Sequence, residues 1–96
     1  MSTKEKREMK IKVSDETLKG CYANTLFVTH TVEEFVLDFV LSLPPQGVIN
    51  SRVIISPGHL KRIIEALKQN LAAYEERHGP LSEAPDPGVK SRDFIH

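Results

Sequence analysis

The chain has 96 residues, which is enough for one domain and too few for two. Its 13 Lys and Arg balance its 13 Asp and Glu, so no bulk charge attracts nucleic acid or an anionic membrane. The single cysteine excludes an internal disulfide, and charged residues interrupt every apolar run before it reaches the length of a membrane span. Because no apolar segment follows the charged N-terminus, we expect no signal peptide and a cytoplasmic protein.

The N-terminal third predicts a short strand, a turn and a longer strand. Residues 1–9 are polar and charged, and we expect them to be disordered. Residues 10–13 alternate and predict a strand, and residues 14–20 predict a turn or a single helical turn that Gly20 ends. Residues 21–29 are rich in aromatic and β-branched residues, which favours a second strand.

The middle of the chain predicts two more strands. Residues 30–34 are polar and typical of a hairpin connection. The apolar residues of 35–43 fit both a helical period and strict alternation. The length of this run, its Phe and Val content and the Pro-Pro-Gln-Gly stop favour a strand. After a turn at 44–47, the β-branched residues 51–56 predict the last strand.

The C-terminal part predicts a long amphipathic helix. Ser56 is a preferred N-cap, Pro57 suits the first helical position, and Gly79 followed by Pro80 ends the run. One face of this helix is apolar and carries Leu60, Ile63, Ile64, Leu67, Leu71 and Tyr74. Residues 80–96 are rich in proline and show no period, so we expect a flexible tail after a single domain at 10–79.

These elements predict an α+β fold: an antiparallel sheet of three to four strands followed by one long C-terminal helix. If the odd-numbered residues of all strands point to the same side of the sheet, the helix covers this odd-numbered face. The even-numbered face then holds an apolar set that one helix cannot also cover: Tyr22, Leu26, Val28, Val36, Val40 and Ile54. Since large apolar patches are uncommon on monomers, we expect this set to be an interaction face between copies of the chain. An ordinary solvated sheet surface with scattered valines is the alternative.

The chain resembles the small bacterial and archaeal family called domain of unknown function 3467. The resemblance covers about residues 18–79. It is carried by Tyr22, Ala23, Asn24, Glu34, Phe35, Asp38, Phe39, Arg52, Val53, Ser56, Pro57, Lys61 and Arg62, and by Asn70, Tyr74, Glu75 and Gly79 near the helix end. Gly58 departs from the Gln or Glu that many members carry there. The resemblance implies a family and assigns no activity.

Two groups of residues suggest chemistry. Cys21 could act as a nucleophile with His30 or His59 as base and Asp38 as orienter, although a free cysteine is more often a small apolar residue. Asp38 and Arg52 share a face, which fits a structural ion pair better than a catalytic carboxylate. We therefore expect no catalytic residues.

The helix start is a candidate anion site. It combines exposed backbone N–H groups with nearby basic residues, namely Ser56, Gly58, His59, Lys61 and Arg62. Any helix that starts with a capped proline has the same features. The four histidines lack metal-ligand spacing, so we expect no metal and no cofactor.

The sequence thus favours a non-catalytic, homo-oligomeric protein-interaction module, whose partner is a second copy or another protein. The alternative is nucleic-acid or anionic-ligand binding through the helix N-terminus with Lys61 and Arg62. Acidic residues dilute the basic stripe on this helix, and no aromatic residues are interleaved with it, which disfavours nucleic acid as a partner.

Overall fold

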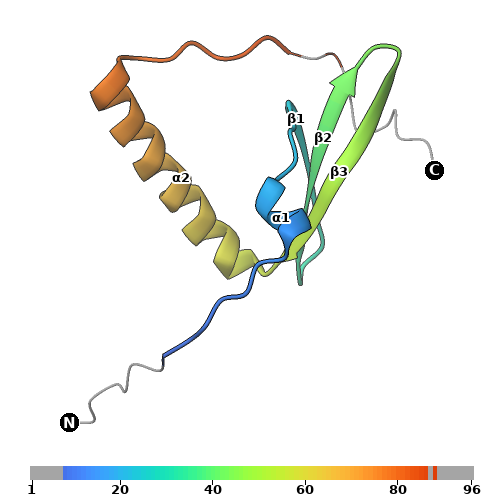
Figure 1. Cartoon of the computed structure of the whole chain (residues 1–96), viewed down its shortest axis with the longest axis vertical. Coiled ribbons are helices and arrows are strands. Elements are labelled where there is room, and N and C mark those ends of the chain that lie inside the picture. The colour runs from blue at the N-terminus through green and yellow to red at the C-terminus, as the bar shows by residue number, and fades with distance from the viewer. Residues whose placement is uncertain (1–7, 87, 89–96) are drawn as a thin grey trace.

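The computed structural model describes residues 8–86 and 88 as a three-stranded sheet with a long helix beside it (Figure 1). The strands β1 (Thr25–His30), β2 (Phe35–Leu43) and β3 (Gln46–Ile55) pair antiparallel in the order β1-β2-β3. The helix α2 (Pro57–His78) follows β3 directly. This confirms the α+β fold. Much of the predicted disordered N-terminus and part of the predicted flexible tail lie outside the described residues.

The segment before the sheet contains the predicted helical turn, α1 (Asp15–Lys19). The side chain of Ser14 caps it by accepting a hydrogen bond from the Thr17 backbone N–H (3.1 Å), and Gly20 ends it at a φ of 75°. The strand predicted at 10–13 is wrong, because this segment pairs with none of the three strands. Its apolar side chains remain in solvent, as the 87 % exposure of Ile11 shows, and a strand without a neighbour has no ladder to stabilise it.

The hairpin between β2 and β3 is longer than its sequence suggests. Leu43 pairs with Gln46, so only Pro44 and Pro45 form the turn, and the peptide bond between them is cis. The last strand therefore begins at Gln46 rather than at Ser51. A register shift between Phe39 and Val40 marks a β-bulge within the β2–β3 pairing. The sequence rule missed this extension because Gly and Asn have low strand propensity, which pairing with a central strand overrides here.

The helix α2 has the predicted limits. The Ser56 side chain accepts a hydrogen bond from the His59 backbone N–H (3.2 Å), and Pro57 takes the first position. At the other end the Gly79 N–H donates to the Glu75 carbonyl (2.8 Å), with Gly79 at a φ of 90°. None of its residues is buried.

The sheet has two chemically distinct faces, because residues paired across strands share a face. The apolar sheet face consists of Leu26, Val28, Phe35, Leu37, Phe39, Leu41, Leu43, Val48, Val53 and Ile55, with His30, Ser51 and Gln46 among them. The ion-pair sheet face consists of Thr25, Phe27, Thr29, Val36, Asp38, Val40, Ser42, Ile49, Arg52 and Ile54.

This arrangement corrects the predicted parity of β1. The sequence predicts a connection at 30–34, which places odd residues of β1 beside odd residues of β2. Instead His30 pairs with Phe35 and the loop has one residue fewer, so every side chain of β1 moves to the other face. The Thr31 side chain stabilises this shorter loop by accepting hydrogen bonds from the backbone N–H groups of Glu33 and Glu34 (3.2 Å each).

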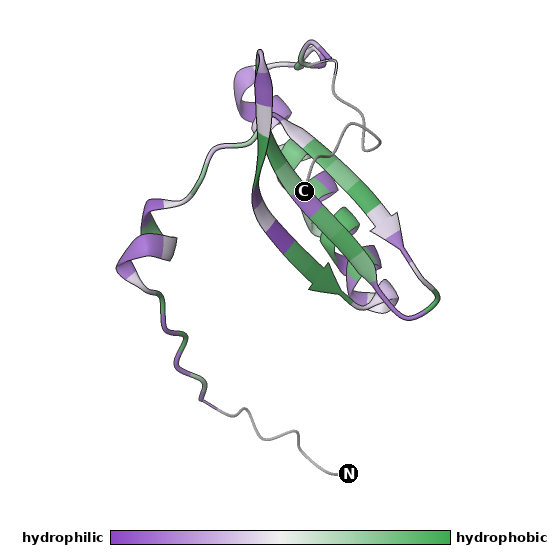
Figure 2. Cartoon of the chain, turned by 90° about the vertical axis from the view of Figure 1, so that its right-hand side faces the viewer, coloured by the Kyte–Doolittle hydropathy of each residue, from purple (hydrophilic) through white to green (hydrophobic). Residues whose placement is uncertain are grey.

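The helix lies on the apolar side of the sheet. The Val40 carbonyl accepts from the Asn24 N–H (3.0 Å), so the even residues of β2 direct their backbone groups toward β1. In Figure 2, β2 runs upward with β1 on its right, and α2 lies behind the sheet. For L-amino acids in this orientation, residues whose backbone groups point to the right have side chains that point toward the viewer. The even residues of β2 therefore point away from α2, and the odd residues of β2, on the apolar sheet face, point toward it. The helix starts near the end of β3 and diverges from the sheet along its length (Figure 1).

Candidate interaction surface

The described residues bury very little apolar surface. Among residues 8–86 and 88, only Leu37 and Val40 are buried hydrophobic residues, with 7 % and 3 % exposure. On the apolar sheet face, Leu26 is 49 % exposed, and on α2, Leu67 is 65 % exposed. Because α2 diverges from the sheet, large parts of the two apolar surfaces that should form a core are left open to solvent, although Leu37 within the sheet face is buried. These open surfaces are the main candidate for a functional site.

The interaction face predicted from sequence is divided by the structure. Leu26 and Val28 lie on the apolar sheet face, whereas Val36, Val40 and Ile54 lie on the ion-pair sheet face. The sixth member, Tyr22, precedes β1 and is 75 % exposed. The cause is the shift of β1 by one residue, so these six residues do not form one continuous patch.

Asp38 and Arg52 form the ion pair that the sequence suggested. They are cross-strand partners, and the Arg52 guanidinium donates to both carboxylate oxygens at 2.6 and 2.9 Å. Asp38 is only 3 % exposed, while the Arg52 side chain reaches solvent. The hydrogen bond and the charge of Asp38 raise the pKa of Arg52. The bidentate pair satisfies the buried carboxylate, which is the arrangement of a structural ion pair.

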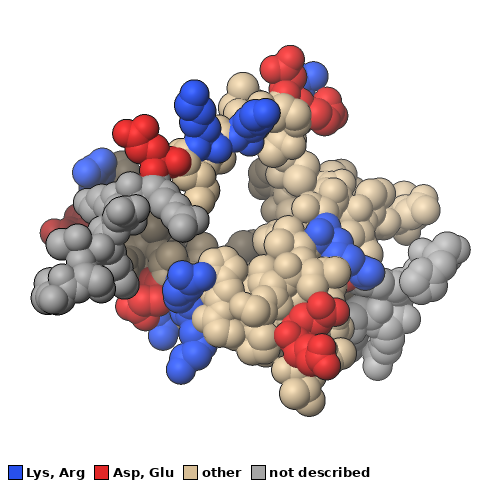
Figure 3. Space-filling model, turned by 90° about the horizontal axis from the view of Figure 1, so that it is seen from below, with Lys and Arg blue, Asp and Glu red and all other residues tan. Residues whose placement is uncertain are grey.

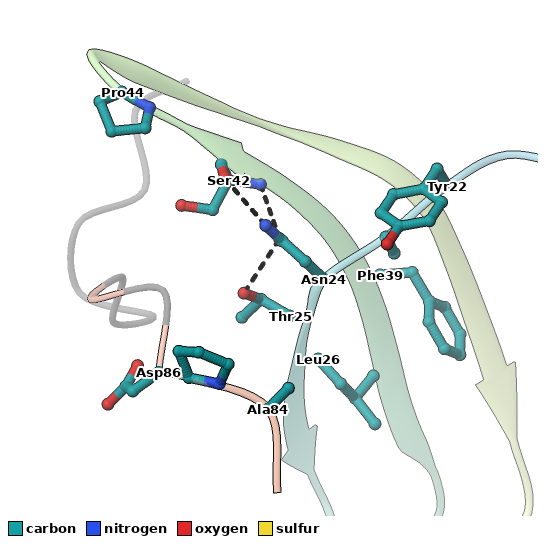
Figure 4. A pocket seen from close by; sticks show the side chains of 11 residues that line it. Tyr22, Asn24, Thr25, Leu26, Phe39, Ser42, Pro44, Ala84 and Asp86 are labelled. Carbon is teal, nitrogen blue, oxygen red and sulfur yellow. Dashed lines mark hydrogen bonds between the residues drawn. The ribbon is translucent and has the colours of Figure 1, made fainter.

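Asn24 anchors the chain that enters β1. Its amide group donates to the Ser42 carbonyl and accepts from the Ser42 N–H, both at 2.9 Å (Figure 4). These bonds continue the pairing of β1 and β2 beyond Thr25, which explains the Asn of the Tyr-Ala-Asn sequence. A hollow of about 750 Å³ lies here, lined by residues 22–26, Phe39, Ser42, Pro44 and 84–86. The side chains of Asn24 and Thr25 and the backbone of Ser42 are already bonded to one another there, so they offer little to recognise a ligand.

The candidate anion site keeps only part of its predicted set together. Ser56 accepts from the His59 backbone N–H, and the Arg62 guanidinium lies 3.1 Å from Nδ1 of the His59 ring. Gly58 is open, with nothing within 4 Å of the place of a Cβ. Lys61 is about 100° from Arg62 around the helix axis, so the two cations point in different directions. No second feature at this helix start indicates a ligand.

The proposed nucleophile Cys21 and its candidate base His30 are not brought together. Cys21 is exposed and precedes β1, while His30 ends β1 and stacks on Phe35 with ring centroids 5.0 Å apart. The six residues of β1 alone hold them about 20 Å apart. Asp38 is engaged by Arg52. Within residues 8–86 and 88, no group of three or more His, Cys, Asp or Glu could hold a metal ion.

The charged side chains are dispersed on the face shown in Figure 3. Lys and Arg lie in small groups interrupted by Asp and Glu and by uncharged surface, and they form no continuous basic area there. Nucleic-acid binding usually needs a basic stripe or patch. None of the helices in the described part of the chain is long and apolar enough to cross a membrane.

Comparison with known proteins identifies a family whose description assigns no activity. No curated protein and no solved structure matches the chain. One family model matches residues 1–83, and thus includes the N-terminal residues that lie outside the resemblance described from sequence. The match covers the sheet and all of α2. The chain therefore belongs to the family described as Protein of unknown function (DUF3467).

Proposed function

We propose that this chain is a non-catalytic, homo-oligomeric protein-interaction module of the cytoplasm. The observation that carries the proposal is the exposure of both the apolar sheet face and the apolar side of α2, although they lie on the same side of the sheet. A second copy that covers these surfaces completes the core that one copy leaves unfinished.

The energetics favour such a partner. Burying a Leu, Ile, Val or Phe side chain contributes about 1.5–3 kcal/mol, and domains of this size are marginal even when compact. Here Leu26, Val28 and Val53 of the sheet are each more than two-fifths exposed, as are Leu67 and Leu71 of the helix. Contiguous apolar patches larger than a few hundred Å² mark interaction sites on soluble proteins.

The absence of a catalytic role is supported by how the reactive groups are used. The buried carboxylate of Asp38 is held by Arg52, the His30 ring stacks on Phe35, and His59 lies against Arg62. Catalytic sites gather such groups around one cavity. In the described part of this chain each group instead has a separate neighbour on a different part of the fold.

The proposal is tested by the mass of the purified full-length chain and by one pair of variants. Native mass spectrometry should find a dimer or a higher state without added mass. Val28→Lys, on the apolar sheet face, should weaken self-association about 10- to 100-fold, because Val28 is 47 % exposed and burying the remainder on both copies contributes about 1.5–3 kcal/mol in total. Thr29→Lys adds the same charge to the next residue of β1, on the ion-pair sheet face, and serves as the matched control.

Each outcome has a clear meaning. A chain that stays monomeric at all concentrations contradicts the proposal. Equal weakening by Val28→Lys and Thr29→Lys shows that the apolar sheet face is not the contact. A bound metal, nucleotide or lipid in the spectrum favours the alternative function in ligand binding instead.

A further inference from the structure

The exposed apolar residues of α2 follow a heptad repeat. Leu60, Ile64, Leu67, Leu71 and Tyr74 are separated by four, three, four and three residues, and we call this set the heptad seam. Such spacing aligns side chains into one stripe that packs into a matching stripe of another helix. Ile64, Leu67, Leu71 and Tyr74 are between 44 % and 65 % exposed, so the described chain itself does not cover the seam.

The charged residues on the two flanks of the seam determine how a partner helix fits. Lys61, Lys68 and Glu75 lie at seven-residue intervals on one flank of the seam, and Ile63, Asn70 and Arg77 lie on the other. In an antiparallel pair of identical helices, each flank lies beside the same flank of the second copy, which runs in the opposite direction. Lys61 then faces Glu75 of the second copy, and Asn70 faces Asn70. Lys68 meets Lys68 near the centre, which is the one contact between like charges, and Ile63 faces Arg77.

A parallel pair gains neither ion pair. In that geometry opposite flanks face each other with an offset of five residues, so Ile63 meets Lys68 and Asn70 meets Glu75. The antiparallel pair also opposes the two helix dipoles favourably. Glu75 is held in place for this role, because one of its carboxylate oxygens accepts a hydrogen bond from the Leu81 backbone N–H (2.9 Å), and a carboxylate has further acceptor positions.

The area of the contact points to a second copy that covers the sheet as well. With 22 residues, α2 is about 33 Å long and about 10 Å wide, so a helix pair buries about 330 Å² on each copy. The strands have six, nine and ten residues, and at about 3.3 Å per residue and about 4.8 Å between strands they present a face of about 400 Å². Together these surfaces approach the roughly 800 Å² per partner of a stable interface, whereas either alone falls well short.

We infer that α2 pairs antiparallel with α2 of a second copy through the heptad seam, with Lys61 of each copy facing Glu75 of the other. Because α2 stands on the apolar side of the sheet, a helix paired with it also lies on that side. This inference rests on the proposed function, since it requires self-association. Beyond the proposed function, it specifies that α2 forms the contact, that the two helices run antiparallel, and which residues select a second copy as the partner.

A charge exchange tests the pairing in the full-length chain. Lys61→Glu should weaken the dimer about tenfold in sedimentation equilibrium, because the two-fold symmetry changes two ion pairs at once. Glu75→Lys should weaken it at least as much, since it also removes the acceptor for Leu81. The double variant Lys61→Glu with Glu75→Lys should recover most of the affinity. Arg62→Glu and Glu76→Lys, on the opposite side of α2, are the matched controls.

Cysteine cross-linking reports the orientation directly. With Cys21→Ser as background, Lys61→Cys combined with Glu75→Cys should form a disulfide between copies under mild oxidation. These positions are 14 residues, or about 21 Å, apart within one helix, so they cannot join within one chain. A wild-type monomer overturns both the proposed function and this inference. A dimer that lacks the 61–75 cross-link, and that Lys61→Glu weakens no more than Arg62→Glu, overturns the helix pairing alone.

Discussion

Single side chains in this protein mainly hold the sheet together. Asp38 lies on the ion-pair sheet face at 3 % exposure and is paired with Arg52 by two short hydrogen bonds. The carboxylate raises the pKa of Arg52, so that side chain is charged at every pH at which proteins are stable. A basic group whose pKa is raised on folding stabilises the fold at lower pH and loses this contribution only as the pH rises through its pKa in the folded state. We therefore expect this guanidinium to impose no pH dependence between pH 5 and 9.

Asn24 provides the most direct stability test at this scale. Asn24→Ala removes both hydrogen bonds to the backbone of Ser42, a residue that is only 8 % exposed. An unsatisfied buried group costs about 1–3 kcal/mol, so the free energy of unfolding in urea should fall by that amount. Asn50→Ala also removes a bond to a backbone carbonyl, that of Tyr22, but at an exposed position. It should cost less, and an equal loss would refute the anchoring role of Asn24.

At the level of elements, the two helices differ in what their caps contribute. The Ser56 cap begins the 22-residue α2, and the Ser14 cap begins the five-residue α1. Both side chains accept a hydrogen bond from the backbone N–H three residues later. The chemistry of the caps is the same, so the length and packing of the helix they start decide their effect on the whole fold.

Ser56→Ala should lower the free energy of unfolding by about 1 kcal/mol, the usual cost of losing an N-cap. Ser14→Ala should change it by much less, because α1 has no buried residues and frays without disturbing the sheet. Chemical denaturation followed by circular dichroism compares the two variants. Equal effects would show that α1 is a cooperative part of the folded domain.

At the scale of the whole molecule, stability and association should be linked. If a second copy covers the apolar sheet face and the heptad seam, folding is completed only in the oligomer, and mass action then raises the melting temperature with protein concentration. Calorimetry over a hundredfold concentration range should show Tm rising steadily. A constant Tm would mean that the single chain carries its full stability, despite the exposure of residues such as Leu67 and Leu26.

The sequence by itself determined the local elements whose signals are short in range. The cap at Ser56 with Pro57 and Gly79 set both ends of α2, and the Phe35–Leu43 strand has the predicted limits. The Asp38–Arg52 pair was also predicted correctly, but the β-bulge is required for it: the two-residue turn pairs Val40 with Ile49, and the register shift after Phe39 restores the pairing of even residues with even residues. These features depend on neighbours along the chain or on one hairpin, where propensity and capping act directly.

Only the tertiary structure decided which residues share a face. One residue fewer in the loop after His30 moved Leu26 and Val28 to the apolar sheet face, and the two-residue turn at Pro44 and Pro45 extended β3 to Gln46. Alternation has a period of two, so an error of one residue in a loop inverts the assignment of a whole strand. The divergence of α2 from the sheet could not be predicted from the sequence pattern either. The pattern indicates that one face of the helix packs against an apolar surface, but it does not indicate which surface this is.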